Sequence, residues 1–325
     1  MEESILVVKN LNTKLLLDNG WVDVVDNLSF ALKKHRTLAL IGESGCGKTI
    51  TALSLMRILP DRPVSCSTGE ILYQGRNLNA LKQKEMSKIR GYKIAMIFQD
   101  PSSALNPVYT VGTQLVEVAN LHLGMFGEIA RQKALVALAE VGLPNPIDLF
   151  DSYPHQLSGG MKQRVMIAMA LMCEPDILIA DEPTTALDVT IQSQILDLIS
   201  DRQKKNGMAL LLITHDMTIV AKMADDVVVM YAGQSIEKGT KADIFDHMAH
   251  PYTKGLFASR PSLHAPRSVL PSIKGSVPSI GNFPCGCRFH PRCPFVMKKC
   301  KLKAIPEFVV DNHVANCLLY EEKDD

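Results

Sequence analysis

This chain of 325 residues lacks a marked net charge, a long apolar run and a basic leader segment. Its formal charge of +1 at pH 7 gives no general attraction for nucleic acid or for an anionic membrane surface. No apolar run approaches the roughly 20 residues of a membrane span. Glu2 and Glu3 stand where a secretory signal would carry basic residues. These absences predict a cytosolic chain whose thiols stay reduced and form no disulfide framework.

The chain is long enough for two domains, and its hydrophobic content of 46% is ample for a packed core. The amino-acid composition changes near residue 250. Five prolines fall between residues 259 and 284, without any sustained periodicity, and a cluster of cysteines follows them. We therefore predict one domain over residues 1–250 and a smaller unit over residues 251–325.

Apolar patterning indicates an α/β fold in the larger domain. Short apolar runs flanked by polar residues are typical of buried parallel strands, and half-alternating runs are typical of exposed antiparallel ones. Apolar residues at helical spacing predict a helix over residues 127–142. The buried parallel strands are expected at residues 37–41, 176–180 and 209–213, the other strands at residues 5–8, 22–32 and 70–73, and a hairpin at residues 227–236.

The segment GESGCGKT matches the pattern GxxxxGK[ST] of a P-loop, after a buried strand and before a helical stretch at residues 50–59. In such a loop, backbone N–H groups and the helix N-terminus surround phosphate oxygens. Lys48 would reach the β- and γ-phosphates, and Thr49 would hold Mg²⁺. A glycine-rich turn with a chance lysine is the alternative, which the context disfavours. The residues expected to bind ATP here are Gly42, Glu43, Ser44, Gly45, Cys46, Gly47, Lys48 and Thr49.

Cys46 within this loop is interpreted as a small residue in the place of serine. Its position at a helix N-terminus predicts a lowered pKa, because the helix dipole favours a thiolate there. Thiol reagents are then expected to attack it, and ATP to protect it.

A second acidic motif ends the apolar run at residues 176–180. A carboxylate at the C-terminal end of a parallel strand, here Asp181, can lie beside the Mg²⁺ of a nucleotide. Glu182 can then act as the general base that polarises the attacking water. Alone, this pattern also suits a capped strand; together with the P-loop it predicts nucleoside triphosphate hydrolysis.

The segment LSGGMKQR, residues 157–164, resembles the signature of the ABC ATPases, whose usual form is LSGGQ; Met161 departs from it. Taken alone, Ser158 before two glycines would be a helix N-cap. Three further motifs of that family stand in order, at Gln99 (Q-loop), residues 185–188 (D-loop) and His215 (switch histidine).

The resemblance covers residues 4–245 and implies the ABC form of the P-loop NTPase fold. That fold has a parallel core sheet, an antiparallel β subdomain and a helical signature subdomain, here followed by the small cysteine-containing unit. Leu15 falls where the family usually stacks an aromatic on adenine, and Trp21 is the large aromatic nearest to it in the chain.

In that family two ATPase subunits close head to tail around two nucleotides. The resemblance implies that Glu182 is the catalytic base and that His215 orients the γ-phosphate. Thr49, Gln99 and Asp181 would bind Mg²⁺, and Gln99 would also contact ATP. The residues expected to serve the partner subunit's ATP are Ser158, Gly159, Gly160 and Met161, with Asp188 in the D-loop.

Several segments resemble the oligopeptide/dipeptide importer subgroup, which has nickel relatives: residues 99–107, 153–157, 181–190 and 250–253 and the cysteine-bearing tail. The resemblance implies a second, related ATPase subunit, two membrane permease subunits and an extracytoplasmic peptide-binding protein. The chain would lie on the cytoplasmic face of the bacterial inner membrane. Residues 99–107 would receive a short permease helix. The alternatives are a nickel importer, half of an exporter, or a soluble ABC ATPase acting on nucleic acid or the ribosome.

The tail segment PCGCRFHPRCPFVMKKC, residues 284–300, lacks the close CxxC pairs of ordinary structural zinc sites. Tails of the peptide importers carry a matching C-x5-C-x6-C-x16-C spacing, and the resemblance implies a four-iron four-sulfur cluster. Zinc and metal-free thiols stay open as alternatives. The expected ligands are Cys287, Cys293, Cys300 and Cys317, with Cys285 outside the pattern.

Overall fold

The computed structural model describes residues 3–18, 20–60, 64–184, 187–259 and 272–321. Contacts divide the chain into two compact units, and each is described by itself. The flanking unit comprises residues 4–32, 37–79 and 213–325, and the central unit comprises residues 1–3, 33–36 and 80–212.

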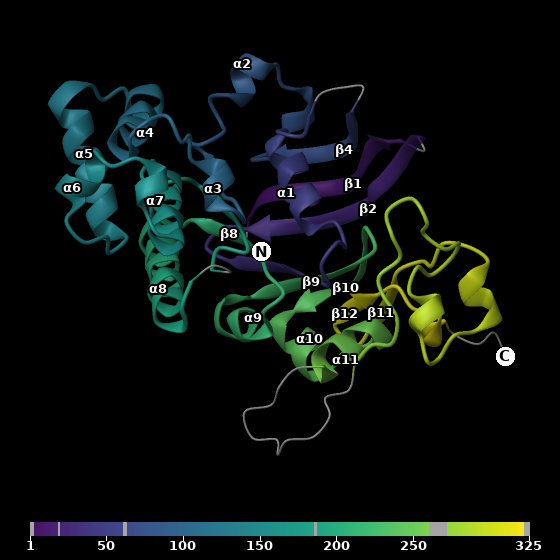
Figure 1. Cartoon of the computed structure of the whole chain (residues 1–325). Coiled ribbons are helices and arrows are strands. Elements are labelled where there is room, and N and C mark those ends of the chain that lie inside the picture. Colours follow the sequence, from purple (N-terminus) through teal and green to yellow (C-terminus); the bar gives the residue numbers. More distant parts are fainter. Residues whose placement is uncertain (1–2, 19, 61–63, 185–186, 260–271, 322–325) are drawn as a thin grey trace. The chain divides into compact units, whose positions relative to one another are not determined.

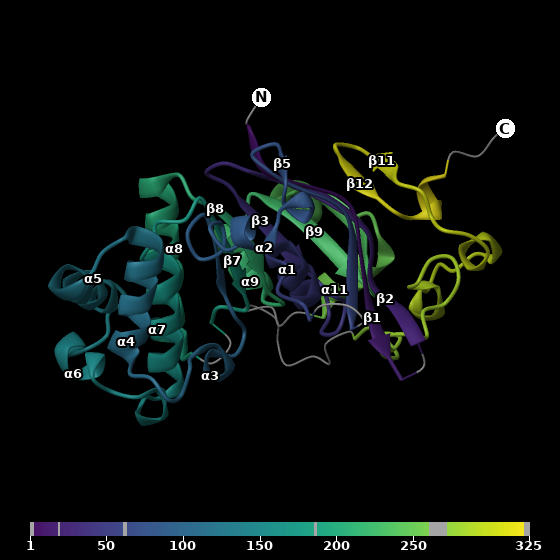
Figure 2. The ribbon, with the colours of Figure 1, turned by 90° about the horizontal axis from the view of Figure 1, so that it is seen from above.

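The flanking unit contains an antiparallel sheet with the strand order β2-β1-β4-β5. Its strands are β1 (Ser4–Leu17), β2 (Gly20–Lys33), β4 (Ser65–Tyr73) and β5 (Arg76–Asn77). The two long strands β1 and β2 run side by side in Figures 1 and 2. β1 pairs with β4 from Leu6↔Tyr73 to Leu15↔Ser65, with a bulge between Lys9 and Asn12.

A second group of strands in the flanking unit has the order β11-β12-β10-β9-β3. These strands are β3 (Thr37–Ile41), β9 (Asp226–Tyr231), β10 (Gln234–Thr240), β11 (Phe308–Val310) and β12 (His313–Ala315). β3 and β9 are parallel, whereas β10 pairs antiparallel with both β9 and β12. The tail therefore adds strands to the sheet that carries the P-loop.

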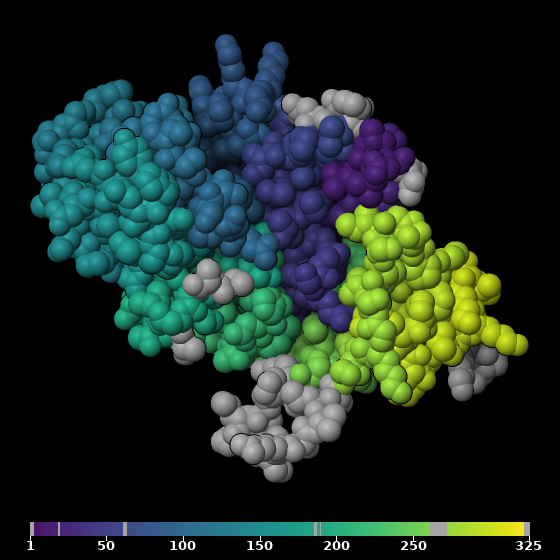
Figure 3. Space-filling model, viewed as in Figure 1, coloured from purple at the N-terminus to yellow at the C-terminus, as the bar shows by residue number. Residues whose placement is uncertain are grey.

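Helices and short 3-10 segments complete the flanking unit. Its helices are α1 (Lys48–Met56), α9 (Met217–Met223), α10 (Lys241–Asp246) and α11 (Pro251–Ala258), and its 3-10 segments are η1 (Leu78–Ala80), η4 (His290–Arg292), η5 (Lys298–Lys301) and η6 (Leu318–Tyr320). Its core includes three aromatic side chains in mutual contact, Tyr231, Tyr252 and Phe289, with ring centroids 4.7–5.4 Å apart. Phe289 comes from the tail, so the tail shares this core. In Figure 3 tail atoms in yellow-green lie beside the N-terminal strands in purple, where Gly281 approaches Val22.

The central unit combines short parallel strands with a group of helices, visible together in Figure 2. β6 and β7 pair in parallel from Ile94↔Ile177 to Ile97↔Ala180. The strands are β6 (Ile94–Ile97), β7 (Ile177–Asp181) and β8 (Ala209–Ile213), and the helices are α2 (Gln83–Met86), α3 (Pro101–Ala104), α4 (Val111–Val118), η2 (Ala119–Leu123, a π-helix), α5 (Gly127–Glu140), α6 (Pro146–Phe150), η3 (Pro154–Gln156), α7 (Gly159–Leu171) and α8 (Val189–Asn206).

The α/β fold and the elements expected from patterning are confirmed. The runs at residues 37–41 and 209–213 coincide with β3 and β8, and the helix predicted at residues 127–142 is α5. The predicted hairpin is β9–β10, whose turn places Ala232 and Gly233 at positive φ. Within the described ranges, no helix is long and apolar enough to cross a membrane. Pro261, Pro266 and Pro271 of the proline-rich segment lie outside the described residues.

Candidate functional site

The P-loop lies between β3 and α1 in the flanking unit, and two of its glycines are required by close backbone packing. A Cβ on Gly42 would lie 2.3 Å from the Met230 carbonyl oxygen, and one on Gly47 would lie 3.0 Å from that of Val24. Both glycines also have positive φ, 154° and 104°. All five residues of β3 are buried, so the loop is anchored at its start.

The Lys48 side chain is held over the P-loop by carbonyl groups of the loop's backbone. Its ammonium donates to the carbonyl oxygens of Gly42 (2.8 Å) and Glu43 (3.0 Å), and the side chain is buried. Ser44 and Gly45 are exposed at the tip, and Thr49 is half-buried in the first turn of α1. The eight expected nucleotide-binding residues are thus contiguous around one helix N-terminus, a suitable cradle for phosphate.

The expected lowering of the Cys46 pKa is wrong. Burial raises the pKa of this thiol, although Lys48 acts in the opposite direction. Cys46 is only 1% exposed, so desolvation of the thiolate outweighs the helix dipole. The interpretation as a small residue in the place of serine stands, because its sulfur fills the space beside Gly42.

Gln99 and Glu182 are brought together in the central unit. They follow the parallel neighbours β6 and β7, so both emerge at the same edge of the sheet. The Gln99 amide donates to the Glu182 carboxylate at 3.2 Å. Asp181, the last residue of β7, is buried with 1% exposure. Glu182 adopts a positive φ of 47°, a costly conformation for a non-glycine residue.

The signature residues begin α7, and the N-cap reading of Ser158 is confirmed by its hydroxyl, which accepts from Met161 N at 3.3 Å. A cap does not exclude a second role, because Gly159 has open space around it. Ser158, Gly160 and Met161 line one hollow of about 440 Å³ together with Asp188. This hollow gathers the signature and the D-loop aspartate on one surface of the central unit.

Asp188 also caps α8, since its carboxylate accepts from Ile191 N at 3.0 Å. Thr185 and Ala186 of the D-loop lie outside the described residues.

His215 lies in the flanking unit, exposed, in the connection between β8 and α9. Its two neighbours make this turn rigid. Asp216 N donates to the Thr214 hydroxyl at 3.0 Å, and the Asp216 carboxylate accepts from Thr218 N at 2.7 Å as the cap of α9. The histidine is therefore presented on a fixed backbone.

The four expected cysteine ligands of the tail line one small cavity, together with His250 and His290. Burial, together with the neighbouring Cys300, Cys317 and Cys293, raises the pKa of Cys287 to about 11. Cys285 is exposed and its thiol donates to the Leu302 carbonyl, outside this cavity. Across the part of the chain that the structure describes, no three His, Cys, Asp or Glu side chains are grouped to hold a single metal ion.

Two residues at these sites have no role in the sequence prediction. Gln163 of α7 donates to the Pro183 carbonyl at 2.7 Å, directly after Glu182. Arg292 of the tail forms an ion pair with Glu43 of the P-loop. Both residues stand inside segments quoted above. Their partners lie 20 positions away for Gln163 and 249 positions away for Arg292, and no spacing in the sequence indicates either contact.

Two families match the chain. The family described as "ABC transporter" matches residues 25–185, and "Oligopeptide/dipeptide transporter, C-terminal region" matches residues 236–300.

Curated relatives match over almost the whole length. The dipeptide transport ATP-binding protein DppD of Bacillus subtilis (strain 168) is 48% identical over 99% of this chain and 96% of its own. The oligopeptide transport ATP-binding protein AppD of the same organism is 45% identical over 98% of each chain. DppD of Escherichia coli (strain K12) is 45% identical over 85% of this chain and 84% of its own.

Solved structures support the fold. The dimeric post-hydrolysis state of an ATP-binding cassette bound to ADP and Pi is 26% identical and covers 72% of this chain and 98% of its own, with a TM-score of 0.65. CbiO1 from Clostridium perfringens, part of an ABC transporter complex, is 30% identical over 76% of this chain and 92% of its own, with a TM-score of 0.61. This chain belongs to the ATP-hydrolysing ABC transporter family and carries the C-terminal region of its oligopeptide/dipeptide branch.

Proposed function

We propose that this chain powers the import of peptides, dipeptides or oligopeptides, across the bacterial inner membrane. The observation that carries the proposal is the near full-length match to proteins named for dipeptide and oligopeptide transport, tail included. The nickel, exporter and nucleic-acid alternatives have no comparable support. The proposed boundary between ATPase and tail stays at residue 250.

In this proposal the P-loop binds the triphosphate, with Lys48 at the β- and γ-phosphates. The residues assigned to Mg²⁺ are Thr49, Gln99 and Asp181, an oxygen-only donor set of the kind this hard cation prefers. When bound, Mg²⁺ neutralises charge on the phosphate oxygens.

Hydrolysis needs a water aligned with the γ-phosphorus. The Glu182 carboxylate accepts a proton from that water. The water oxygen bonds to phosphorus, and the bond between phosphorus and the ADP oxygen breaks. The Gln99 amide supports the assignment, since its hydrogen bond restrains Glu182. His215, on its rigid turn, orients the γ-phosphate.

The signature surface is proposed to act on a different nucleotide. Ser158, Gly159, Gly160 and Met161, with Asp188, would contact the ATP held by a second, related ATPase subunit, giving a heterodimer. The hollow that most of them share supports this, because it lies open on one surface and can receive a loop of the partner. ATP would close the dimer and hydrolysis would open it.

Coupling to transport requires separate membrane permease subunits and an extracytoplasmic peptide-binding protein, with this chain on the cytoplasmic face of the membrane. The segment after Gln99 is the proposed contact. Val108 and Tyr109 follow it in the central unit with 70% and 51% of their surface exposed. Large apolar side chains exposed side by side suit a buried contact with a permease helix.

The tail is proposed to hold a four-iron four-sulfur cluster on Cys287, Cys293, Cys300 and Cys317. Their shared cavity supports this. Their four thiolates would be the ligands of such a cluster. The cluster, when bound, supplies a covalent staple. Anaerobic purification should give about four irons and sulfides per chain, lost in Cys300→Ser and kept in Cys285→Ser; one zinc instead would contradict it.

Fractionation tests the transport assignment. A tagged chain expressed at native level should stay with washed membranes and bring down two permeases and a second ATPase, identified by mass spectrometry. Release into the soluble fraction or into ribosome pellets would contradict the proposal.

A further inference from the structure

The tail cysteine segment makes an ion pair with the P-loop. Arg292 donates from both terminal nitrogens to the Glu43 carboxylate, at 2.6 and 3.0 Å. The arginine side chain is 5% exposed and that of Glu43 is 29% exposed. A two-pronged Arg–carboxylate pair is specific in geometry, and its paired, charge-assisted hydrogen bonds make it stronger than an ordinary surface salt bridge.

Arg292 is fixed from the tail side by several contacts. Its guanidinium donates to the carbonyl oxygens of Ile273, Lys274 and Gly275. It also donates to the Tyr231 hydroxyl at 3.4 Å. Because these contacts hold the guanidinium in place, the ion pair fixes the position of the Glu43 carboxylate.

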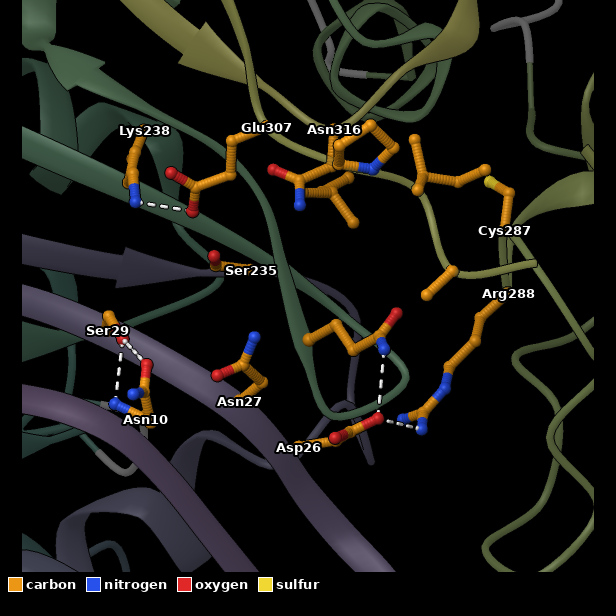
Figure 4. Close-up of a pocket in the computed structure, with 15 residues that line it drawn as sticks. Asn10, Asp26, Asn27, Ser29, Ser235, Lys238, Cys287, Arg288, Glu307 and Asn316 are labelled. Atoms are coloured by element: carbon orange, nitrogen blue, oxygen red, sulfur yellow. Dashed lines mark hydrogen bonds and ion pairs between the residues drawn. The ribbon is translucent and has the colours of Figure 1, made fainter. Parts of the chain in front are cut away.

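Two further contacts tie the same part of the P-loop to this region. The Glu43 backbone N–H donates to the Tyr252 hydroxyl at 2.8 Å. Arg288, four residues before Arg292, donates to the Ala232 carbonyl and to Asp26, a contact visible in Figure 4. The neighbouring Gly233 N–H donates to the Cys46 carbonyl at 2.9 Å, so the second arginine braces the back of the loop.

The charges of this ion pair affect nucleotide binding as well as packing. Glu43 is a carboxylate within a loop that must accept a triphosphate, and like charges repel. We propose that Arg292 is a positioning residue of the ATP site, which draws the Glu43 carboxylate toward the tail and neutralises it so that the anionic nucleotide can enter. The proposal rests on the P-loop's role in ATP binding and not on the transported substrate.

Three variants of the full-length protein test this by titration with a fluorescent MgATP analogue. Arg292→Gln leaves the Glu43 charge uncompensated and should weaken MgATP binding about tenfold, and the less charged MgADP about threefold. Adding Glu43→Gln to Arg292→Gln removes the repulsion, so affinity should return to within about threefold of wild type. Glu43 is expected to bind phosphate through its backbone N–H, which Glu43→Gln keeps, so this variant alone should bind at least as tightly as wild type.

Lys238→Gln is the matched control. Lys238 pairs with Glu307 at 2.6 Å, another ion pair between the tail and the rest of the flanking unit. Figure 4 shows this pair across the pocket from Arg288 and Asp26. Its loss should leave MgATP affinity unchanged.

The rescue separates charge compensation from simple structural damage. A double variant as weak as Arg292→Gln, or Arg292→Gln with wild-type affinity, would overturn the proposal. If Arg292→Gln does not fold, the other two variants still decide, because Glu43→Gln weaker than wild type would also overturn it. Lys48→Ala guards the premise: if it binds MgATP as wild type does, the P-loop assignment itself fails, and not only the role of Arg292.

Discussion

Gln163 offers a way to test whether α7 holds the proposed catalytic base in place. Its amide nitrogen donates to the Pro183 carbonyl at 2.7 Å, one residue after Glu182, and its side chain is 1% exposed. Gln163→Leu keeps most of the volume and removes this anchor. Because Glu182 has an unfavourable φ of 47°, this segment should relax to a lower-energy backbone conformation once the anchor is removed.

The stability cost follows from two opposing effects. Leaving the buried Pro183 carbonyl without its donor costs about 1–3 kcal/mol. The Gln163 amide oxygen, however, is buried without a hydrogen-bond partner in the described residues, so its removal returns about 1 kcal/mol. The net loss should be about 0–2 kcal/mol, or a fall in Tm of at most roughly 8 °C.

The effect of Gln163→Leu on kcat should be larger than its effect on stability. A displacement of the base by a fraction of an ångström lowers kcat about tenfold, since a shift of about 1 Å costs about a hundredfold. Phosphate release measured under saturating MgATP gives kcat, and nucleotide titration should show unchanged affinity. Gln132→Leu is the control, because Gln132 is exposed on α5 and bonds only to Glu128 among the contacts described. Gln163→Leu with wild-type kcat and a lowered Tm would refute the positioning argument.

Three further predictions concern the base, the thiols and pH. Glu182→Gln should lower phosphate release by about 10²- to 10⁴-fold with MgATP affinity retained; parallel loss of binding would contradict its role as base. Cys46 should react with iodoacetamide far more slowly than the exposed Cys285, because burial raises its pKa, and peptide mapping after a timed pulse would show equal labelling if this is wrong. Burial lowers the pKa of His122, so the unfolded chain binds the proton first and the free energy of unfolding should decrease below about pH 6.5. Urea denaturation at pH 7.5 and 5.5 should show a smaller decrease for His122→Phe, which keeps the stacking on Tyr92, and an equal decrease would count against it.

The parallel core could be predicted closely from sequence. The runs at residues 37–41 and 209–213 coincide with β3 and β8 because a strand buried on both faces must be apolar throughout. The motifs located the P-loop, Gln99 and Glu182 for a similar reason, because each stands just after such a strand. The hydrogen bond between Gln99 and Glu182 was not predicted; it forms because parallel strands end at one edge of the sheet.

The tail could not be predicted in the same way. β11 and β12 have three residues each, too few to show a period, and Phe289 reaches the core from a segment rich in proline and cysteine that has no sustained periodicity. The Arg292–Glu43 pair joins residues 249 positions apart, and neither residue type is unusual in its local segment. Contacts of this kind depend on tertiary packing, which local patterns do not encode.

Peptide-stimulated ATP hydrolysis by the complete complex is the decisive measurement for the proposed transport function. The chain would be purified with its permease and partner ATPase subunits, reconstituted in lipid vesicles, and assayed for phosphate release with and without the peptide-loaded binding protein. Stimulation should require peptide and should be abolished by Lys48→Ala in this chain. Hydrolysis that ignores the binding protein and peptide, while a nickel-loaded or nucleic-acid partner stimulates it, would contradict the account.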